Sequence, residues 1–416
     1  MFYNYPYFRY ESVGKLVISV FAFTVGKPIS KAIITITEVN NKEVIFGSLE
    51  TDISGKTSII YLPAPLPIYS SNNLDKPFSE YDIYIKANGY QDKLIKNVQI
   101  YPNSKAEQQV FLLPTSEINS KKIINISYPT LWGNYPAKEI ENPIKELPAS
   151  LGFVVLPNPV VPEFVIVHAG PPSSDAPNYK VPFIDYIKNV ACCELYSTWP
   201  KETLKANILA IISFTLNRVY TEWYISKGYN FTITGSHAYD QAYDHGRTIY
   251  EEISILVDTI FTTFITKPGI RQPLLAQYCD GKKSNCPNAL RQWGSKSLGD
   301  DGFLAIDILK RYYGSDIFLM EANKVEGIPK SFNGENLQLG SKGNNVKIIQ
   351  EQINTINQNY PGINKLKVNG EFDDDTRISV EKFQEVFDLP TTGIVDFATW
   401  YKISAIYVAV EQMISL

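Results

Sequence analysis

Two similar five-residue segments near the C-terminus restrict the fold of this chain more than any other feature. Residues 369–373 read Asn-Gly-Glu-Phe-Asp, and residues 392–396 read Thr-Gly-Ile-Val-Asp. Each segment supplies a glycine for an unusual backbone angle and an apolar side chain to fill a core. Before the first segment, Val346, Ile349, Ile353 and Ile356 are spaced three and four apart, as on one helix face. Between the two segments, Ile378, Phe383 and Phe387 follow a similar helical pattern. The pattern predicts a small helical module with two matched turns, its second helix beginning near Thr376.

The block around these turns resembles the peptidoglycan-binding domain of bacterial cell-wall hydrolases, a three-helix module. The resemblance rests on order and spacing, in particular on Leu339-Gly340, Gly343, Val346, Ile349-Gln350, the segment 369–373, Thr376, Val380, Phe383-Gln384, Leu389, Gly393-Ile394-Val395 and Thr399-Trp400. It implies that residues 331–416 bind peptidoglycan. Residues 354–366 form a long insert relative to that family, so detailed ligand contacts are not carried over.

The first part of the chain, residues 1–114, has the pattern of an all-β domain. Residues 16–23 alternate with the period of a strand, and residues 32–37, 81–87 and 110–113 are further expected strands. The order resembles a carboxypeptidase-regulatory-like, transthyretin-like β-sandwich. We find no acid–base pair in this part and assign no catalysis to it.

Prolines punctuate residues 115–180, which predicts an extended linker with one strand at Phe164–His168. The stretch from Leu147 to Val155 would be accessible to a protease if it lies on the surface.

Composition sets outer limits on the function. A chain of 416 residues suggests two to four domains. A net charge of −4 argues weakly against nucleic acid as a partner, and three His are too few for a His-rich metal site. The sequence contains no run of eighteen apolar residues, so we expect no membrane span. The N-terminus lacks the basic and apolar regions of a secretory signal. A wall enzyme without an export signal either has lost that signal or reaches its wall without crossing a membrane, as in endospores.

Residues 181–330 carry the candidate chemistry. Their motifs are the segments 190–200, 204–207, 240–243, 292–295 and 308–314. This succession resembles the stage II sporulation protein D-like family of lytic transglycosylases. The whole arrangement looks like that of clostridial germination-specific spore cortex-lytic enzymes, which implies a precursor activated by a subtilisin-like protease in the spore envelope. The β-sandwich and part of the linker would then form the pro-region, with a cut near residues 147–155.

The resemblance implies that Glu194 is the single acid and base, with no cofactor. Phe183, Ile187, Val190 and Ala191 fall at helical spacing, and Glu194 continues that stripe to the helix end. Desolvation and the negative end of the helix dipole would raise the pKa of the carboxyl, as a general acid requires. One carboxylate suffices in such a reaction because the muramic C6 hydroxyl is the nucleophile, whereas ordinary glycosidases need two. The alternative is a Glu that frays from a helix end into solvent.

Polar and aromatic residues of the other motifs are candidate substrate-binding residues: Lys205, Asn207, Gln241, Tyr243, Gln292 and Trp293. Amides and rings suit hydrogen bonding to and stacking on sugars. For Lys205 and Asn207 the alternative is a solvated helix face, and for the others it is a place in the core or at an interface. Residues 204–219 are expected to form a core helix that supports Glu194.

Cys279 and Cys286 bracket a polar loop and leave two interpretations open. One is a loop-closing disulfide, and the other is a zinc site completed by His237 and His245. Cys192 and Cys193 are expected to be packing residues, and His168 to be structural.

Two other functions remain open at the level of sequence. A non-catalytic wall-binding scaffold would keep the C-terminal module without needing Glu194. A hydrolase of the same bond would use water and leave a reducing muramic acid.

Overall fold

The computed structural model describes residues 12–23, 26–39, 42, 44–66, 76–117, 123–145, 158–284, 286 and 288–414. The chain forms two compact units and is therefore multidomain, as expected. One unit comprises Met1–Ser127, Gly246–Glu252 and Phe332–Leu416, and the other comprises Tyr128–His245 and Ile253–Ser331. The division into four parts at residues 114, 180 and 330 stays a prediction.

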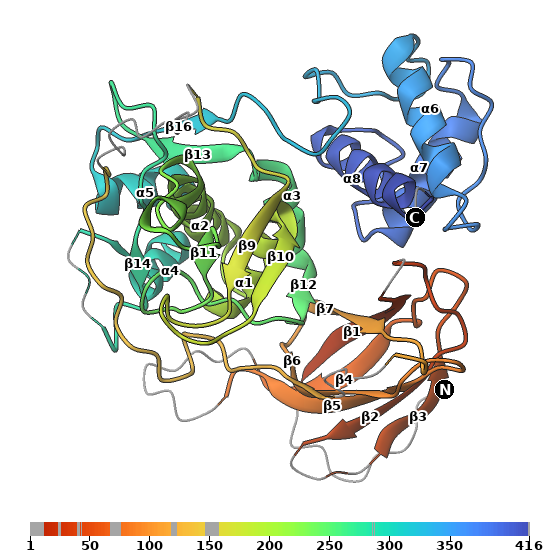
Figure 1. The fold of residues 1–416 in the computed structure, drawn as a ribbon, viewed down its shortest axis with the longest axis horizontal. Helices are drawn as coiled ribbons and strands as arrows, with labels where there is room; N and C mark the ends of the chain where they lie inside the picture. The colour runs from red at the N-terminus through yellow and green to blue at the C-terminus, as the bar shows by residue number, and fades with distance from the viewer. Residues whose placement is uncertain are drawn as a thin grey trace. The chain divides into compact units, whose positions relative to one another are not determined.

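The N-terminal part of the first unit is built from two sheets (Figure 1). One has the order β12-β7-β1-β4, in which β1 pairs parallel with β7 and antiparallel with β4. The other has the order β3-β2-β5-β6-β8. The four expected strands are confirmed as β1 Ser12–Ala22, β2 Ile33–Glu38, β5 Ser79–Lys86 and β7 Lys105–Leu112. The structure adds five strands that the sequence analysis did not name: β3 Val44–Glu50, β4 Ile60–Ala64, β6 Lys93–Ile100, β8 Ile123–Asn125 and β12 Ile249–Tyr250.

The C-terminal part of the first unit is helical, with α6 Asn344–Ile356, α7 Asp374–Val386 and α8 Phe397–Ile414. The apolar face expected on α6 is confirmed, because Val346, Ile349, Ile353 and Ile356 are all fully buried. On α7 the expectation for Ile378 is wrong, since this side chain is 43% exposed while Val380 and Phe383 are buried. Ile378 lies five residues before Phe383, which places it about 140° around the helix from the buried face.

The two matched turns are built alike around buried glutamines. The Gln350 amide oxygen accepts from the N–H groups of Asn369 and Gly370, at 3.1 and 2.9 Å. The Gln384 amide oxygen accepts from Thr392 and Gly393, both at 2.9 Å. Both glycines have positive φ, 74° and 67°, and the apolar residues Phe372 and Val395 are buried as expected.

The second unit is arranged around α2 Lys201–Tyr220, which is buried along most of its length and contacts α1, α4, α5 and β13 (Figure 1). The expected helix over 204–219 and the expected strand at 164–168 are confirmed. The remaining elements are β9 Phe164–His168, β10 Asn178–Pro182, α1 Phe183–Glu194, η1 Ile225–Lys227, β11 Ile233–Thr234, α3 Glu251–Ile260, β13 Thr263–Thr266, β14 Tyr278–Cys279, β15 Leu290–Arg291, α4 Gln292–Asp300, α5 Ala305–Tyr313 and β16 Phe318–Glu321.

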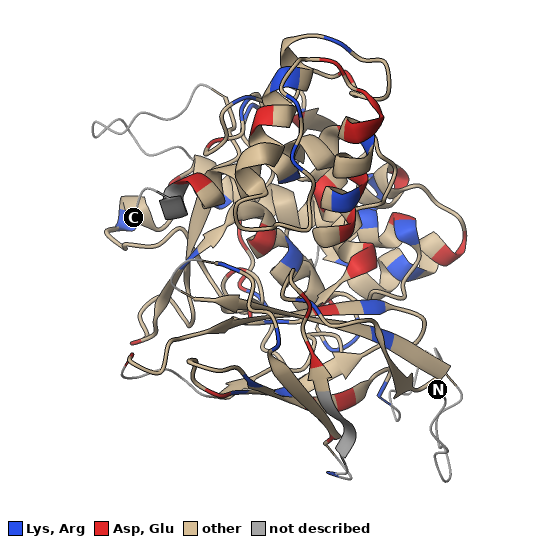
Figure 2. Ribbon diagram, turned by 90° about the vertical axis from the view of Figure 1, so that its right-hand side faces the viewer, with Lys and Arg blue, Asp and Glu red and all other residues tan. Residues whose placement is uncertain are grey.

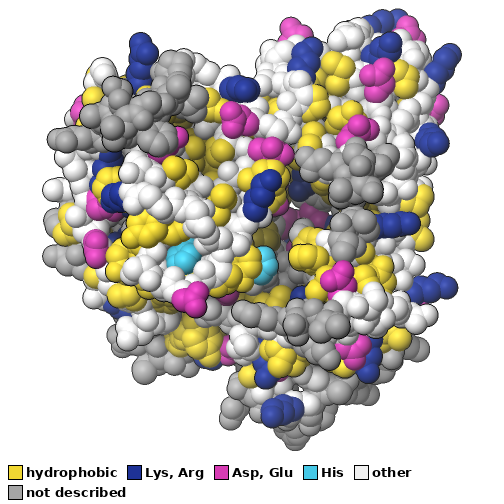
Figure 3. Space-filling model, in the orientation of Figure 1, with side chains coloured by type: hydrophobic (Ala, Val, Ile, Leu, Met, Phe, Trp, Pro, Cys, Tyr) yellow, Lys and Arg dark blue, Asp and Glu magenta, His cyan; other side chains and the backbone are white. Residues whose placement is uncertain are grey.

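The surface is mixed in character. Figure 2 shows acidic and basic residues interspersed over helices and strands. On the face drawn in Figure 3, hydrophobic side chains lie among polar and charged ones. Within the described ranges, none of the helices has the length and apolar character that crossing a membrane requires.

Candidate active site

The carboxylate of Glu194 lies at the end of α1 and is completely buried. One oxygen accepts from the Thr130 hydroxyl at 2.7 Å. The other lies 3.0 Å from the Ala242 N–H, 3.0 Å from Nδ1 of His237 and 3.4 Å from the Tyr278 hydroxyl. Four donors from three separate segments of the second unit therefore meet at one carboxylate, and the fraying alternative does not hold.

The charges around Glu194 correct the expectation of a raised pKa. Burial raises the pKa of this carboxyl, but the charges of His237 and Lys138 and the hydrogen bonds from His237 and Ala242 lower it more. The net effect holds the pKa of Glu194 well below its usual range. The expectation considered only the helix end and desolvation, whereas these partners arrive from elsewhere in the chain.

Lys138 is the second buried charge of the site. Its ammonium nitrogen lies 4.0 Å from the Glu194 carboxylate and 4.0 Å from the ring centre of Tyr278. It also donates to the backbone oxygen of Asp240 at 2.7 Å. Burial lowers the pKa of Lys138 to about 8, although Glu194 and Asp240 both act to raise it. The lysine is therefore held at a cost in desolvation.

Thr130 and Lys138 belong to residues 128–145. The composition of this segment predicts a linker, but in the structure the segment is a packed part of the second unit. The Thr130 N–H donates to the Cys193 oxygen at 2.9 Å, and Glu139 donates to Ala238 at 3.0 Å. Arg218 pairs with Glu141, and Gln272 exchanges hydrogen bonds with the backbone of Lys145 at 3.0 and 2.9 Å. Sequence reasoning missed both residues, since no motif or spacing marks them.

Three of the amides expected to bind substrate are buried and bonded within the protein. Gln241 accepts from Tyr186 and Thr215 at 3.1 and 2.9 Å, and Asn207 donates to Ser295 at 2.8 Å. Gln292 donates to the backbone oxygen of Glu194 at 3.1 Å. Gln292 and the segment around Gln241 are thus brought to Glu194, and Asn207 lies between α2 and α4.

The other three expected residues are more accessible. The Tyr243 hydroxyl lies 3.0 Å from Nδ1 of His245, whose ring stacks on Tyr179 with centroids 4.0 Å apart. Trp293 packs edge-on against Trp199, with centroids 5.2 Å apart, and has the Lys282 ammonium 3.5 Å above its ring centre. Lys205 is half-buried on α2. Tyr243 follows Ala242, whose N–H donates to the Glu194 carboxylate, and its ring stacks on Tyr186 with centroids 5.8 Å apart.

The cysteines resolve the alternatives that the sequence left open. Cys279 and Cys286 form a disulfide, with Cα atoms 6.1 Å apart. The residues that the structure describes contain no group of three or more His, Cys, Asp or Glu placed to hold a metal. Cys192 and Cys193 are buried in α1, where the Cys193 thiol donates to the Asn189 amide oxygen at 3.6 Å, and His168 bonds to Asn178 at 2.8 Å.

Comparison with known protein families gives the class of the C-terminal part. Residues 342–403 match the family of putative peptidoglycan binding domains. The chain therefore carries a helical peptidoglycan-binding domain, which gives it peptidoglycan as a partner and a role related to the cell wall.

Solved structures show only distant likenesses. The chain is similar to the SleB N-terminal domain at 29% identity, covering 18% of this chain and 93% of that domain, with a TM-score of 0.16. It is similar to GBS52, the minor pilin of Streptococcus agalactiae, at 18% identity, covering 27% of this chain and half of the pilin, with a TM-score of 0.19. TM-scores this low do not establish a shared fold. No curated protein matches the chain.

Proposed function

We propose that this chain is a lytic transglycosylase that degrades spore cortex peptidoglycan during germination and is made as a protease-activated precursor. It cleaves the β-1,4 bond between N-acetylmuramic acid and N-acetylglucosamine and leaves a 1,6-anhydro end. The main support is the Glu194 carboxylate, which donors from separate segments hold in one position. A fixed carboxylate in a chain that also carries a peptidoglycan-binding domain fits a general acid–base for a glycan.

The reaction uses Glu194 first as a proton donor and then as a proton acceptor, so the residue ends in the protonation state in which it began. Protonated Glu194 donates to the glycosidic oxygen as the bond from that oxygen to muramic C1 breaks. The C6 hydroxyl of the same sugar attacks C1 and gives its proton to the Glu194 carboxylate. No water is consumed, and a second carboxylate is not required. In this proposal Tyr243 and Trp293 contact the sugar, and Lys205 lies at the edge of the substrate-binding site. The buried amides of Asn207, Gln241 and Gln292 support the structure around Glu194.

The precursor is proposed to be inactive because residues 128–145 cover the carboxylate and keep it ionised. Thr130 and Lys138 both contact Glu194 and both favour its charged form. When these contacts leave, two interactions that favour the carboxylate are lost, which moves the pKa of Glu194 upward toward the value that a general acid needs, while the contacts with His237 and Ala242 stay. The proposed cut near 147–155 lies largely outside the described residues. The N-terminal strands would be a transthyretin-like sandwich within the pro-region.

One observation favours a second function. Glu194 is fully buried and bonded on both oxygens, as a purely structural carboxylate would be. A non-catalytic wall-binding scaffold is therefore the competing proposal.

Mass spectrometry of the muropeptides released from isolated spore cortex separates these functions. The protein, treated with a subtilisin-like protease, is compared with its Glu194→Gln variant. Anhydromuramic ends from the parent and none from the variant are expected. Reducing ends would show hydrolysis, and a folded, cortex-binding protein that releases nothing would favour the scaffold.

A further inference from the structure

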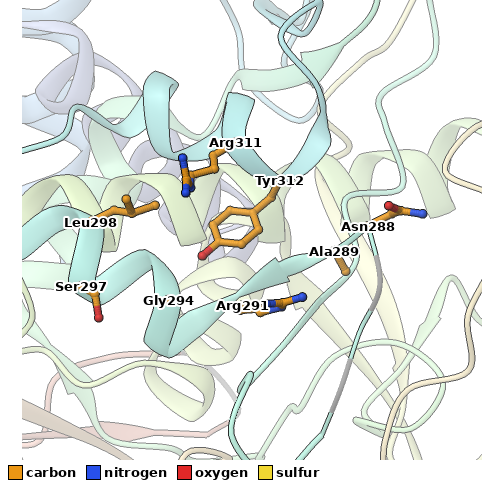
Figure 4. Close-up of a pocket in the computed structure, with 8 residues that line it drawn as sticks. All are labelled: Asn288, Ala289, Arg291, Gly294, Ser297, Leu298, Arg311 and Tyr312. Carbon is orange, nitrogen blue, oxygen red and sulfur yellow. The ribbon is translucent and has the colours of Figure 1, made fainter.

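A cavity of about 510 Å³ lies among β15, α4 and α5 of the second unit. Arg291 of β15 and Arg311 of α5 line it, together with Ser297 and Gly294 of α4 and Tyr312 of α5. Figure 4 shows the Tyr312 ring between the two arginine side chains in that view. The function proposed above does not use this cavity.

The two guanidinium groups have no partner for their charge. Neither Arg291 nor Arg311 forms an ion pair or side-chain hydrogen bond with any residue that the structure describes. Two cations close to one cavity repel each other, so they favour an anion between them. Guanidinium groups present forked donors that match carboxylate and phosphate oxygens.

The phenol ring of Tyr312 lies between the two arginine side chains in the view of Figure 4. Burial raises the pKa of Tyr312, while Arg291 and Arg311 both act to lower it, so both charges lie close to this hydroxyl. Gly294 makes room for it, because a β-carbon at that position would lie 2.3 Å from the Tyr312 oxygen. The cavity therefore offers a hydroxyl donor flanked by two cationic donors.

One pair of adjacent residues links the cavity to the candidate active site along the chain. Gln292, the residue after Arg291, donates to the backbone oxygen of Glu194 at 3.1 Å. A glycan bound at Glu194 would carry its peptide stem on the neighbouring muramic acid, and such stems bear free carboxylates.

We propose that this cavity is a binding site for the carboxylates of peptidoglycan stem peptides, with Arg291, Arg311 and Tyr312 as donors. The proposal rests on the proposed function for the identity of its substrate. It adds a preference: strands that carry peptide stems bind more tightly than strands stripped of them.

Calorimetric titration of the whole protein tests this with a soluble stem tripeptide, L-alanyl-γ-D-glutamyl-diaminopimelate. The double variant Arg291→Gln/Arg311→Gln is expected to bind roughly tenfold more weakly, the loss of about one charge-assisted interaction. Lys310→Gln is the matched control, because it removes a positive charge from α5 one residue away without lining the cavity. Binding by the C-terminal domain is common to all variants, so only the lost component belongs to the cavity.

A second probe tests the proposal on the unaltered protein, so its result does not depend on whether the variants fold. The same tripeptide with its carboxylates converted to amides should bind the unaltered protein as weakly as the unmodified peptide binds the double variant. Equal affinity of the amidated and free peptides would overturn the proposal, as would equal affinity of the double variant and the Lys310→Gln control. If poly(glycerol phosphate) binds through the arginines and the peptide does not, the site recognises a phosphate polymer and the peptide assignment is wrong.

These titrations need no bond cleavage. Arginine-dependent peptide binding without anhydromuramic products would leave this inference standing and remove the transglycosylase proposal. Anhydromuramic products without arginine-dependent binding would do the reverse.

Discussion

At the scale of the residue, Glu194 shows how tertiary contacts override a local tendency. A carboxyl at a helix C-terminus, removed from water, would have a raised pKa. His237, Lys138 and Ala242 come from other segments and reverse that direction. The carboxylate is thus a stabilising charge in this state, and the proposed role as a general acid requires that part of that environment leaves.

The same carboxylate predicts a dependence of stability on pH. The pKa of Glu194 is below its ordinary value of 4.5 in the folded protein, so the unfolded chain takes up the proton first as pH falls. Its stabilisation is fully present above pH 4.5 and is lost progressively below it. Between pH 6 and pH 3 the free energy of unfolding should fall by on the order of 2 kcal/mol more than in Glu194→Gln.

Denaturant unfolding followed by tryptophan fluorescence measures this difference, because four of the five Trp lie in the second unit. Glu321→Gln, which removes an exposed carboxylate at the end of β16, is the control and should retain the dependence of the parent. Parallel pH profiles for Glu194→Gln and the parent would contradict this view of the site.

At the scale of the element, the matched turns of the C-terminal part depend on one buried amide each. Gln384 receives two backbone N–H groups and donates to the Ile394 oxygen at 2.9 Å. Gln350 does the same for the first turn, with the Glu371 oxygen at 2.9 Å. The sequence predicted the turns from their glycines and placed both glutamines in the motif, but the role of the glutamines in holding the turns is seen only in the fold.

Replacing Gln384 with Leu should loosen the second turn selectively. The change leaves the Thr392 and Gly393 N–H groups without their acceptor, at a cost of about 2–4 kcal/mol. Hydrogen exchange followed by mass spectrometry should show roughly 30-fold or faster exchange around residues 392–394, with the turn at 369–371 unchanged. Gln358→Leu, an exposed position after α6, is the control. Unchanged exchange at 392–394 would mean that Gln384 does not hold the turn.

At the scale of the whole molecule, the segment 128–145 relates the order of the chain to control of the site. It joins the second unit through Thr130, Lys138 and Glu141, so a region that composition assigns to a linker is part of a packed structure. Under the proposed function, this segment limits the rate at which the uncut chain cleaves glycan, and the affinity of the chain for the wall does not.

Weakening the segment should therefore activate the uncut chain. Thr130→Val with Lys138→Met removes the hydroxyl and the charge that face Glu194, and should raise the rate of anhydromuramic product formation roughly tenfold before any proteolysis, as loss of about 1.4 kcal/mol of restraint would. The control pair Thr259→Val with Lys201→Met lies away from Glu194 on α3 and α2. A double variant that stays as inactive as the precursor, yet responds normally to the protease, would refute the restraint by these two contacts.

Local sequence patterns were sufficient to predict several helices and strands and the class of the C-terminal domain. Helical spacing placed Glu194 at the end of α1, alternation gave the N-terminal strands, and motif spacing gave the peptidoglycan-binding domain. These features depend on neighbours within a few residues, where periodicity and turn chemistry act. Long-range packing was needed to establish three further features: Ile378 faces solvent, Cys279 pairs with Cys286, and the carboxylate is surrounded by Thr130, Lys138, His237 and Tyr278. The contacts around Glu194 join positions 43 to 84 residues apart, and no local pattern encodes which distant side chains meet there.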